Sequence, residues 1–324
     1  MRLWPFLILS AACAPAAAPA PVTAPASTET TPPEPPAPPP EPVAPPPLVS
    51  PDGVQILPCP DAPEDGMLCV AGGPFTRGFD GEHGCEEGEI RNAQTNHNPS
   101  ATVWLQSYLI DVNEVTYAQY QACVVADGCK ARKPNYYDFR RDDLPMTGTS
   151  WYESRDYCRF IHKDLPTEAQ FERASRTEDG GLHPWGDDPA DCAKAVIMDE
   201  TGRGCGTPKS GSHPEKGRPL AVGSRPSYAG LHDMIGNAEE WVLDWYRPYK
   251  DCGDDCLGTD PKGPCAGLET CGEYGRKVVK GGSWYWGPTC ATAANRRHHV
   301  PSNDPYHHFG FRCAKALNTP TDPP

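Results

Sequence analysis

The chain of 324 residues contains no long hydrophobic segment. Its most apolar stretch, residues 3–9, is much shorter than the roughly 20 residues that a transmembrane helix needs. Basic residues are also scarce, because 29 lysines and arginines face 43 aspartates and glutamates, which gives a formal net charge of −14. This charge makes nucleic acids and anionic lipid headgroups unfavourable partners. The sequence therefore predicts neither a membrane-spanning helix nor a nucleic-acid partner.

Several common catalytic and architectural patterns are missing. The sequence has no Gly-x-Ser-x-Gly motif, which carries the nucleophile of α/β-hydrolases, and no His-Glu-x-x-His motif, which binds zinc in metalloproteases. It also lacks internal repeats with a period of about 20–50 residues, so a solenoid or a propeller is not expected.

The first thirteen residues have the composition of a secretory signal. Arg2 gives a positively charged start, residues 3–9 an apolar core, and Ser10-Ala-Ala-Cys13 an end of small residues. Two outcomes are open. Cys13 becomes the lipidated first residue of a lipoprotein that is anchored to the membrane without spanning it, or the chain is cleaved within residues 14–18. Both predict an exported protein, either a cell-envelope lipoprotein or a periplasmic or secreted one.

Residues 14–50 are rich in proline, alanine, threonine and glutamate. Such a segment buries too little apolar surface to fold, so we expect a disordered linker that is largely extended as polyproline II. At ~3.1 Å per residue it could place a domain up to ~100 Å from an anchor, as an envelope tether or as a plain spacer. Residues 51–317 are long enough for one large domain with its own core, and residues 318–324 form a short disordered tail.

Cysteines are abundant. Fourteen of the fifteen remain when Cys13 is set aside, and an even number in an exported chain predicts a framework of up to seven disulfides. Short sequence separations suggest three of the pairs, which are Cys59–Cys69, Cys123–Cys129 and Cys192–Cys205.

Regular secondary structure should be sparse, because the chain has 31 glycines and 40 prolines. Alternating polarity predicts strands at residues 103–112, 240–244 and 276–280. Three capping boxes, Thr116–Gln119, Ser150–Glu153 and Thr167–Gln170, predict helices that end before Gly128, before Pro166 and near Arg176. Loops should fill most of residues 177–229, and loops of that length need metals, disulfides or function to hold them.

Four sequence blocks carry a family resemblance. They are Trp151-Tyr-Glu-Ser-Arg-Asp-Tyr-Cys through Arg173, Gly230-Leu-His-Asp-Met-Ile-Gly-Asn-Ala-Glu-Glu-Trp through Tyr246, Val278-Val-Lys-Gly-Gly-Ser-Trp284, and Gly310-Phe-Arg-Cys313. In this order they resemble the sulfatase-modifying-factor family, whose founding activity is the formylglycine-generating enzyme. The resemblance spans roughly residues 70–317. It implies an α+β fold related to C-type lectins, low in regular structure and stabilised by calcium, with a disulfide between Cys158 and Cys313.

The resemblance also implies a calcium site. The family's pattern of a side-chain oxygen, two backbone carbonyls and a glutamate falls on Asp233, Gly236, Ala238 and Glu240. Calcium prefers six to eight such hard oxygen ligands. The alternative is a turn whose acidic residues face solvent. The family's other calcium site, near residues 193–201, lacks the expected side-chain oxygen here.

The family's copper site is not retained. Formylglycine-generating enzymes hold Cu(I) between two cysteine thiolates, where oxygen converts a peptide cysteine to formylglycine, and soft sulfur suits Cu(I). The two positions are Trp286 and Ala291 in this chain. Cys290 stands beside the second one, and with Ser283 it is the remaining candidate for a catalytic role. A half-cystine is the expected role of Cys290, which makes copper a doubtful cofactor.

Other residues match the family's substrate groove. They are Ser283, Trp284, Trp286, Arg296 and Arg297, and aromatic and arginine side chains together can hold peptide, protein or sugar-like ligands. Glu239 stands where the family usually has tryptophan, which replaces an aromatic contact with a charge. Four histidines, His298, His299, His307 and His308, would suit a metal, although neighbours in an extended segment point in opposite directions. A surface loop is the simpler interpretation.

Two functions are therefore open. The first is an extracytoplasmic accessory or ligand-binding module that keeps the fold and one structural calcium, with its membrane contact through a lipid at Cys13. The second is a metal- and oxygen-dependent oxidoreductase that converts a peptide cysteine to formylglycine, with copper or with another metal at the loop of residues 298–308.

Overall fold

The computed structural model describes residues 47–81, 85, 96–208, 217–302 and 307–317. The predicted signal, the tail and nearly all of the predicted linker lie outside these residues. These described residues form one compact unit. Within the described residues no helix is long and apolar enough to cross a membrane.

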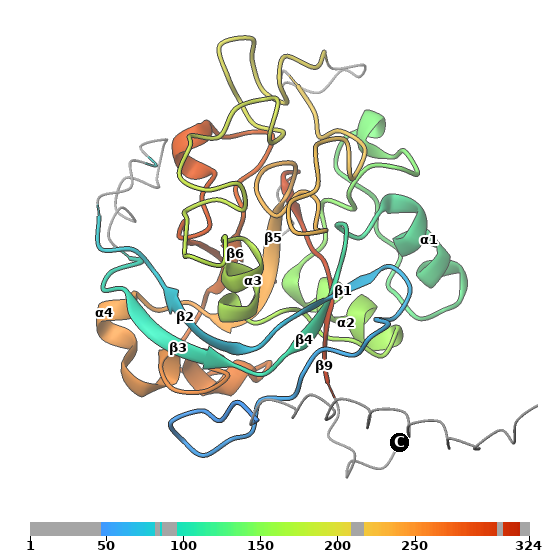
Figure 1. The fold of residues 1–324 in the computed structure, drawn as a ribbon. Coiled ribbons are helices and arrows are strands. Elements are labelled where there is room, and N and C mark those ends of the chain that lie inside the picture. Colours follow the sequence, from blue (N-terminus) through green and yellow to red (C-terminus); the bar gives the residue numbers. More distant parts are fainter. Residues whose placement is uncertain (1–46, 82–84, 86–95, 209–216, 303–306, 318–324) are drawn as a thin grey trace, which may run out of the picture. The chain divides into compact units, whose positions relative to one another are not determined.

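A four-stranded sheet occupies the centre of this unit (Figure 1). It contains β5 (Glu239–Trp245), β6 (Lys277–Lys280), β7 (Arg297–His299) and β8 (Phe309–Gly310), in the order β7-β6-β5-β8. The β5–β8 pair is parallel and the other two pairs are antiparallel. Every residue of β5 is buried, so this strand is the axis of the fold.

Three helices begin where their capping boxes predicted them. They are α1 (Tyr117–Val125), α2 (Trp151–Phe160) and α3 (Glu168–Ala174), and each starts with reciprocal hydrogen bonds between the cap residue and the third helical residue. The third helix ends at Ala174, earlier than expected, because Ser175 adopts a non-helical conformation and its hydroxyl donates to the Phe171 carbonyl.

The central sheet separates two hydrophobic clusters because its side chains alternate between faces. Trp241 and Val279 pack into one cluster together with Trp151 of α2. Val242 and Val278 pack into the other, which contains the buried residues of α3. The sheet therefore lies between α2 and α3, and both helices are anchored to β5.

Two smaller sheets cover the α3 side of the core. One has the order β1-β4-β9, with β1 (Met67–Val70), β4 (Tyr108–Asp111) and β9 (Ala314–Ala316). The other pairs β2 (Gly73–Arg77) with β3 (Ala101–Leu105). Side chains of β2, β3 and β4 join the same cluster as α3.

The prediction of a single strand at residues 103–112 is wrong, because these residues belong to two strands, β3 and β4, in different sheets. At the break, the Gln106 amide donates to Asp260 Oδ1 at 2.8 Å. The Ser107 hydroxyl accepts a hydrogen bond from the Gly72 amide at 2.9 Å. Because these two residues form hydrogen bonds outside the strand ladders, the pairing of β3 ends before that of β4 begins.

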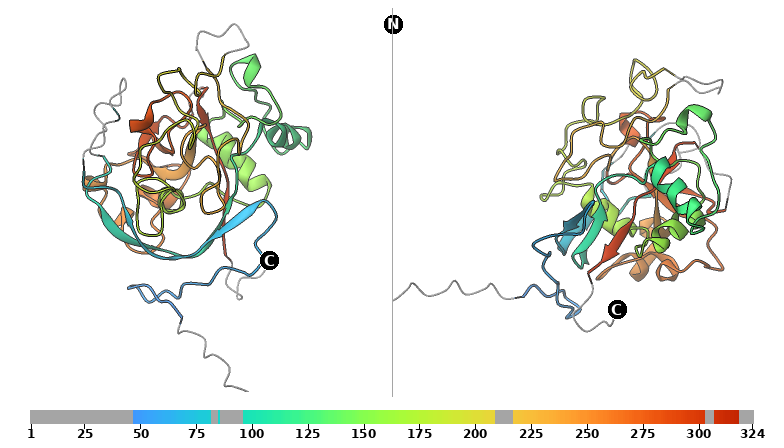
Figure 2. Two further views of the ribbon diagram at one scale, coloured as in Figure 1. Left: turned by 45° about the horizontal axis from the view of Figure 1, so that its top comes forward. Right: turned by 90° about the vertical axis from the view of Figure 1, so that its right-hand side faces the viewer.

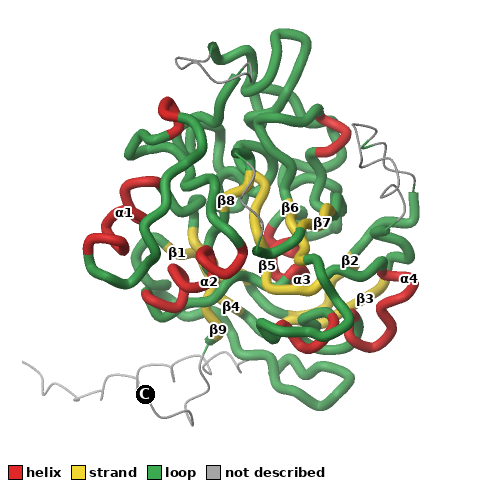
Figure 3. The backbone as a smooth tube through the Cα atoms, turned by 180° about the vertical axis from the view of Figure 1, so that it is seen from behind, coloured by secondary structure: helices red, strands yellow, loops and turns green. Residues whose placement is uncertain are grey.

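Loops dominate the rest, as Figures 2 and 3 show. Residues 177–208 and 217–238, described between α3 and β5, contain no helix or strand, in agreement with the prediction. The remaining described helices are short: α4 (Tyr249–Cys252) and the 3-10 turns Tyr137–Phe139, Gly253–Cys256, Pro264–Gly267 and Pro288–Cys290.

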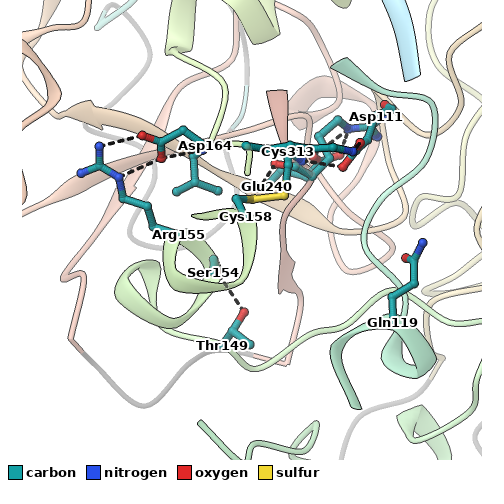
Figure 4. The surroundings of a disulfide bond; sticks show 12 residues. Asp111, Gln119, Thr149, Ser154, Arg155, Cys158, Asp164, Glu240 and Cys313 are labelled. Carbon is teal, nitrogen blue, oxygen red and sulfur yellow. Dashed lines mark hydrogen bonds and ion pairs between the residues drawn. A yellow bond between two sulfur atoms is a disulfide. The ribbon is translucent and has the colours of Figure 1, made fainter. Parts of the chain in front are cut away.

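Seven disulfides hold these loops. The four predicted pairs are present, including Cys158–Cys313, which joins α2 to the residue before β9 (Figure 4). The other three, which sequence left unpaired, are Cys85–Cys290, Cys252–Cys256 and Cys265–Cys271.

Candidate functional site

Cys290, which lies beside the predicted copper positions Trp286 and Ala291, has no free thiol. Cys290 forms a disulfide with Cys85, with a Cα–Cα distance of 4.6 Å, and both residues are buried. Trp286 packs against this pair. A bridged sulfur is neither a thiolate ligand nor a nucleophile. The half-cystine expectation for Cys290 is confirmed, and its candidacy as a catalytic residue is wrong.

Three of the five predicted groove residues are inside the protein. Ser283 and Trp284 are 0% exposed and Arg296 is 1% exposed. The chain turns inward through Gly281 and Gly282, whose φ angles of 91° and 71° favour glycine. The prediction that these three side chains line an accessible groove is therefore wrong, and the same burial leaves Ser283 unsuited to catalysis on an external substrate.

Arg296 is buried because it is fully paired. Its Nε and Nη2 atoms donate to the two oxygens of Glu168 at 2.6 and 2.8 Å, and Nη1 donates to the Asn96 carbonyl at 2.7 Å. Its guanidinium lies 3.6 Å from the ring centre of Tyr249. Burial would lower the pKa of Arg296, but the charge of Glu168 raises it. Arg296 therefore stabilises the core as a permanent cation.

The other two groove residues, Trp286 and Arg297, are partly exposed. The Arg297 guanidinium lies 4.7 Å from the Trp286 ring centre, and its Nη1 atom donates to Glu239 Oε2. Glu239 is 1% exposed, and burial raises its pKa although the Arg297 charge lowers it. The glutamate that replaces the family's tryptophan is thus one half of a charge pair beneath Trp286.

Two further side chains continue this surface. The Tyr285 ring centre lies 4.8 Å from that of Trp286, and the Arg203 guanidinium lies 3.5 Å from the Tyr285 ring centre. We refer to Arg203, Tyr285, Trp286 and Arg297 as the aromatic–arginine row. Sequence reasoning missed Arg203 because it comes from a distant loop without a motif of its own.

A histidine lies behind the aromatic–arginine row. His308 stacks on Tyr285 with ring centres 5.1 Å apart, and its Nε2 atom is 3.7 Å from Glu239 Oε2. Burial and the neighbouring Arg297 charge lower the pKa of His308 well below its usual value. The imidazole is therefore neutral at neutral pH, and the charge pair consists of Glu239 and Arg297.

The four histidines His298, His299, His307 and His308 do not form one cluster, although the ring centres of His307 and His308 lie 5.1 Å apart. His298 packs on Tyr246 at 4.0 Å between ring centres, whereas His299 faces Phe309 at 5.4 Å. His298 and His299 thus have different partners, as expected for neighbours in a strand. Over the described ranges, no three histidine, cysteine or acidic side chains form a group that could hold a metal. The described part of this loop, residues 298–302 and 307–308, therefore gives no support to a metal centre.

The two predicted carboxylate ligands of calcium, Asp233 and Glu240, are buried just before and within β5. Asp233 adopts a left-handed conformation with φ 53°. Its Oδ2 accepts from the Gly223 amide at 2.6 Å, while its buried Oδ1 has no hydrogen-bond partner among the described residues. Glu240 binds Arg312 through both oxygens, at distances between 2.7 and 3.0 Å. One ligand thus has an uncommitted oxygen, and the other shares its oxygens with an arginine.

The charge around these ligands favours a cation. Glu114 accepts from the Ala238 amide at 2.7 Å and is buried with Asp233 and Glu240. Burial raises the pKa of all three carboxyl groups, and the charges of Asp233 and Glu240 raise that of Glu114 further. The Arg312 charge lowers the pKa of all three carboxyl groups, and the charges of His232 and Arg225 also lower that of Asp233. The donor set fits a hard cation such as calcium at Asp233 and the adjoining carbonyls, and calcium at this position remains a prediction.

The fold and this site define a disulfide-rich α+β domain with little regular secondary structure and a central mixed sheet. The chain belongs to the family described as sulfatase-modifying factor enzyme 1-like domain, which it matches over residues 55–317. The predicted family and fold class are therefore confirmed.

Individual relatives cover different parts of the chain. The uncharacterised protein YfmG of Bacillus subtilis is 35% identical over 147 residues, which are 39% of this chain and 29% of YfmG. The formylglycine-generating enzyme of Bos taurus is 24% identical over 306 residues, covering 78% of this chain and 75% of that protein. The structure of PvdO from Pseudomonas aeruginosa aligns with a TM-score of 0.59 at 21% identity, covering 78% of this chain and 94% of PvdO. At that identity PvdO shows the fold alone.

Proposed function

We propose that this chain is an extracytoplasmic accessory or ligand-binding member of its family that lacks the copper oxidase centre. One observation carries the proposal: Cys290, the cysteine next to the copper positions, is bridged to Cys85. With Trp286 and Ala291 at the two positions themselves, no pair of thiolates is available to hold Cu(I) linearly.

The aromatic–arginine row supports a binding role. One member, Trp286, stands at a position where the family's copper cysteine is expected, and all four members are partly exposed. Rings beside arginines are the side chains that most often dominate binding energy in interfaces. A peptide, protein or sugar-like ligand would contact this row.

Export and calcium belong to the same proposal. Seven disulfides are typical of proteins that mature outside the cytosol. A lipid on Cys13 would anchor the domain to a membrane of the cell envelope. One calcium ion at Asp233, Gly236, Ala238 and Glu240 would offset the buried carboxylates there, which gives it a structural role.

A disulfide and thiol map of the protein from an oxidising compartment tests the proposal. We expect Cys290 in a peptide linked to Cys85, no stoichiometric Cu(I) binding, and no conversion of a cysteine-containing sulfatase peptide. A free thiol at Cys290 together with one bound Cu(I) per chain would contradict the proposal and favour the oxidoreductase. Metal analysis of the same sample should find calcium, and loss of calcium to a chelator should lower the melting temperature.

A further inference from the structure

The aromatic–arginine row has a regular chemical order. It runs cation, ring, ring, cation from Arg203 through Tyr285 and Trp286 to Arg297, with successive separations of 3.5, 4.8 and 4.7 Å. The members come from the loop before β5, the turn after β6, and β7 itself. Because three separate segments build it, the row is a product of the tertiary fold and not of one local motif.

Arg297 keeps unused hydrogen-bonding capacity at this surface. Its guanidinium carries several N–H donors, and the described residues accept one hydrogen bond from it, at Glu239. Glu239 and the Trp286 ring hold the guanidinium in place, while 16% of the Arg297 side chain stays exposed. A planar, preorganised guanidinium with spare donors suits a carboxylate, which it can bind through two parallel hydrogen bonds.

Trp286 adds a flat apolar contact next to that guanidinium. Trp286 is partly exposed, and the part of a large aromatic ring that its neighbours leave open packs well against the apolar face of a ring-shaped ligand. The overall charge of −14 disfavours acidic ligands on most of the protein surface. The two arginines of the row place positive charge at this one position. A ligand that satisfies both contacts carries a carboxylate on a ring.

We propose that the aromatic–arginine row binds an acidic carbohydrate, in which Arg297 pairs with the carboxylate of a uronic acid residue and Trp286 packs against its sugar ring. This assignment rests on the proposed binding function and names its ligand class. An acidic peptide would use the same guanidinium, but its flexible side chain would not need the indole. The dependence on Trp286 therefore separates the two ligands.

Calorimetric titration of the exported protein with oligogalacturonate, with a neutral galacto-oligosaccharide of equal length and with a glutamate-rich peptide tests the assignment. We expect oligogalacturonate to bind and the neutral sugar to bind at least tenfold more weakly. Arg297→Ala should weaken oligogalacturonate binding by about ten- to a hundredfold, the range for a lost charged hydrogen-bond pair, and Trp286→Ala should weaken it by a similar factor. Arg173→Ala is the matched control, because Arg173 lies in α3 and is also only partly buried.

Three results would overturn the assignment. They are no binding at millimolar oligogalacturonate, equal binding of the acidic and neutral sugars, and equal effects of Arg297→Ala and Arg173→Ala. Peptide binding that tolerates Trp286→Ala would replace the carbohydrate with an acidic peptide. Melting temperatures of the variants show that they remain folded. The thiol map tests the proposed function separately. If Cys290 is bridged but the protein does not bind oligogalacturonate, only the proposed ligand class is contradicted.

Discussion

Lys277 is a lysine that the fold removes completely from water. Its Nζ donates to the Leu243 carbonyl at 2.7 Å and lies 3.8 Å from the Trp151 ring centre and 4.1 Å from that of Trp245. Burial lowers the pKa of Lys277 to about 7, although the nearby Asp244 charge raises it. Such an amine releases its proton in the folded state far more easily than in the unfolded state.

The lowered pKa of Lys277 predicts that stability rises with pH above neutrality. Between pH 7 and the ordinary lysine pKa of 10.5 the unfolded chain binds a proton that the folded chain has released, so the free energy of unfolding increases with pH. From pH 7 to 9 the contribution is at most about 2.7 kcal/mol. Urea unfolding at these two pH values should show the increase for the native protein and a smaller one for Lys277→Met. Equal increases for both proteins would contradict this account.

Glu172 also has a lowered pKa, but at acidic pH and because it is buried among cations. Burial would raise its pKa, but Lys280 and Arg176 lower it to about 2, through contacts of 3.2 Å to Lys280 and 2.8 Å to Arg176. Its stabilising effect is therefore complete above the ordinary glutamate pKa of 4.5 and is lost as the pH falls toward 2.

Removing the Glu172 charge should destabilise the protein strongly at neutral pH. Glu172→Gln leaves Lys280 and Arg176 buried with one carboxylate fewer, which predicts a loss of about 3 kcal/mol in the free energy of unfolding. The difference from the native protein should narrow at pH 3. Glu178→Gln, an exposed change in the segment that follows α3, is the control and should have little effect at either pH.

At the scale of elements, the helices were the most predictable part of the fold. Their capping boxes connect residues three apart, so Thr116, Ser150 and Thr167 each carry the signal and its structural partner in one short stretch. The break between β3 and β4 had no such local signal. It depends on Asp260, which is 154 residues from Gln106 in sequence.

The capping boxes make a quantitative prediction for α2. Ser150→Ala removes the hydroxyl that accepts from the Glu153 amide at 3.3 Å, and it should lower the free energy of unfolding by about 1 kcal/mol. Chemical denaturation measures this change, with Ser150→Thr as the conservative variant that keeps the cap. An alanine variant as stable as the native protein would show that tertiary packing alone defines the start of the helix.

At the scale of the whole molecule, two disulfides illustrate different roles. Cys158–Cys313 closes a separation of 155 residues, whereas Cys123–Cys129 closes one of 6. In the chain-entropy description the long bridge stabilises by about 5 kcal/mol and the short one by about 2.

Paired alanine substitutions test this difference. Cys158→Ala with Cys313→Ala should lower the melting temperature more than Cys123→Ala with Cys129→Ala, as differential scanning calorimetry would measure. Equal losses would show that constraint of the unfolded chain is not the main effect of the long bridge.

The site could be predicted from the sequence only in part. The sequence predicts the loss of the copper cysteines at Trp286 and Ala291, because these positions follow a recognisable Gly-Gly-Ser block. It does not predict the burial of Arg296 or the partner of Cys290. Their partners, Glu168 and Cys85, come from distant segments. A sequence alone does not distinguish an arginine that is paired in the core from one that is exposed.

Glu239 and Glu240 are adjacent on β5, yet their carboxylates serve opposite faces of the central sheet. Glu239 pairs with Arg297 beneath the aromatic–arginine row, while Glu240 pairs with Arg312 in the core, near the Cys158–Cys313 bridge (Figure 4). Randomised libraries at positions 285 and 286, which are partly exposed, would therefore leave both buried glutamate–arginine pairs intact. The domain is in this sense a scaffold for directed evolution, on which new binding specificities can be selected without redesigning the core.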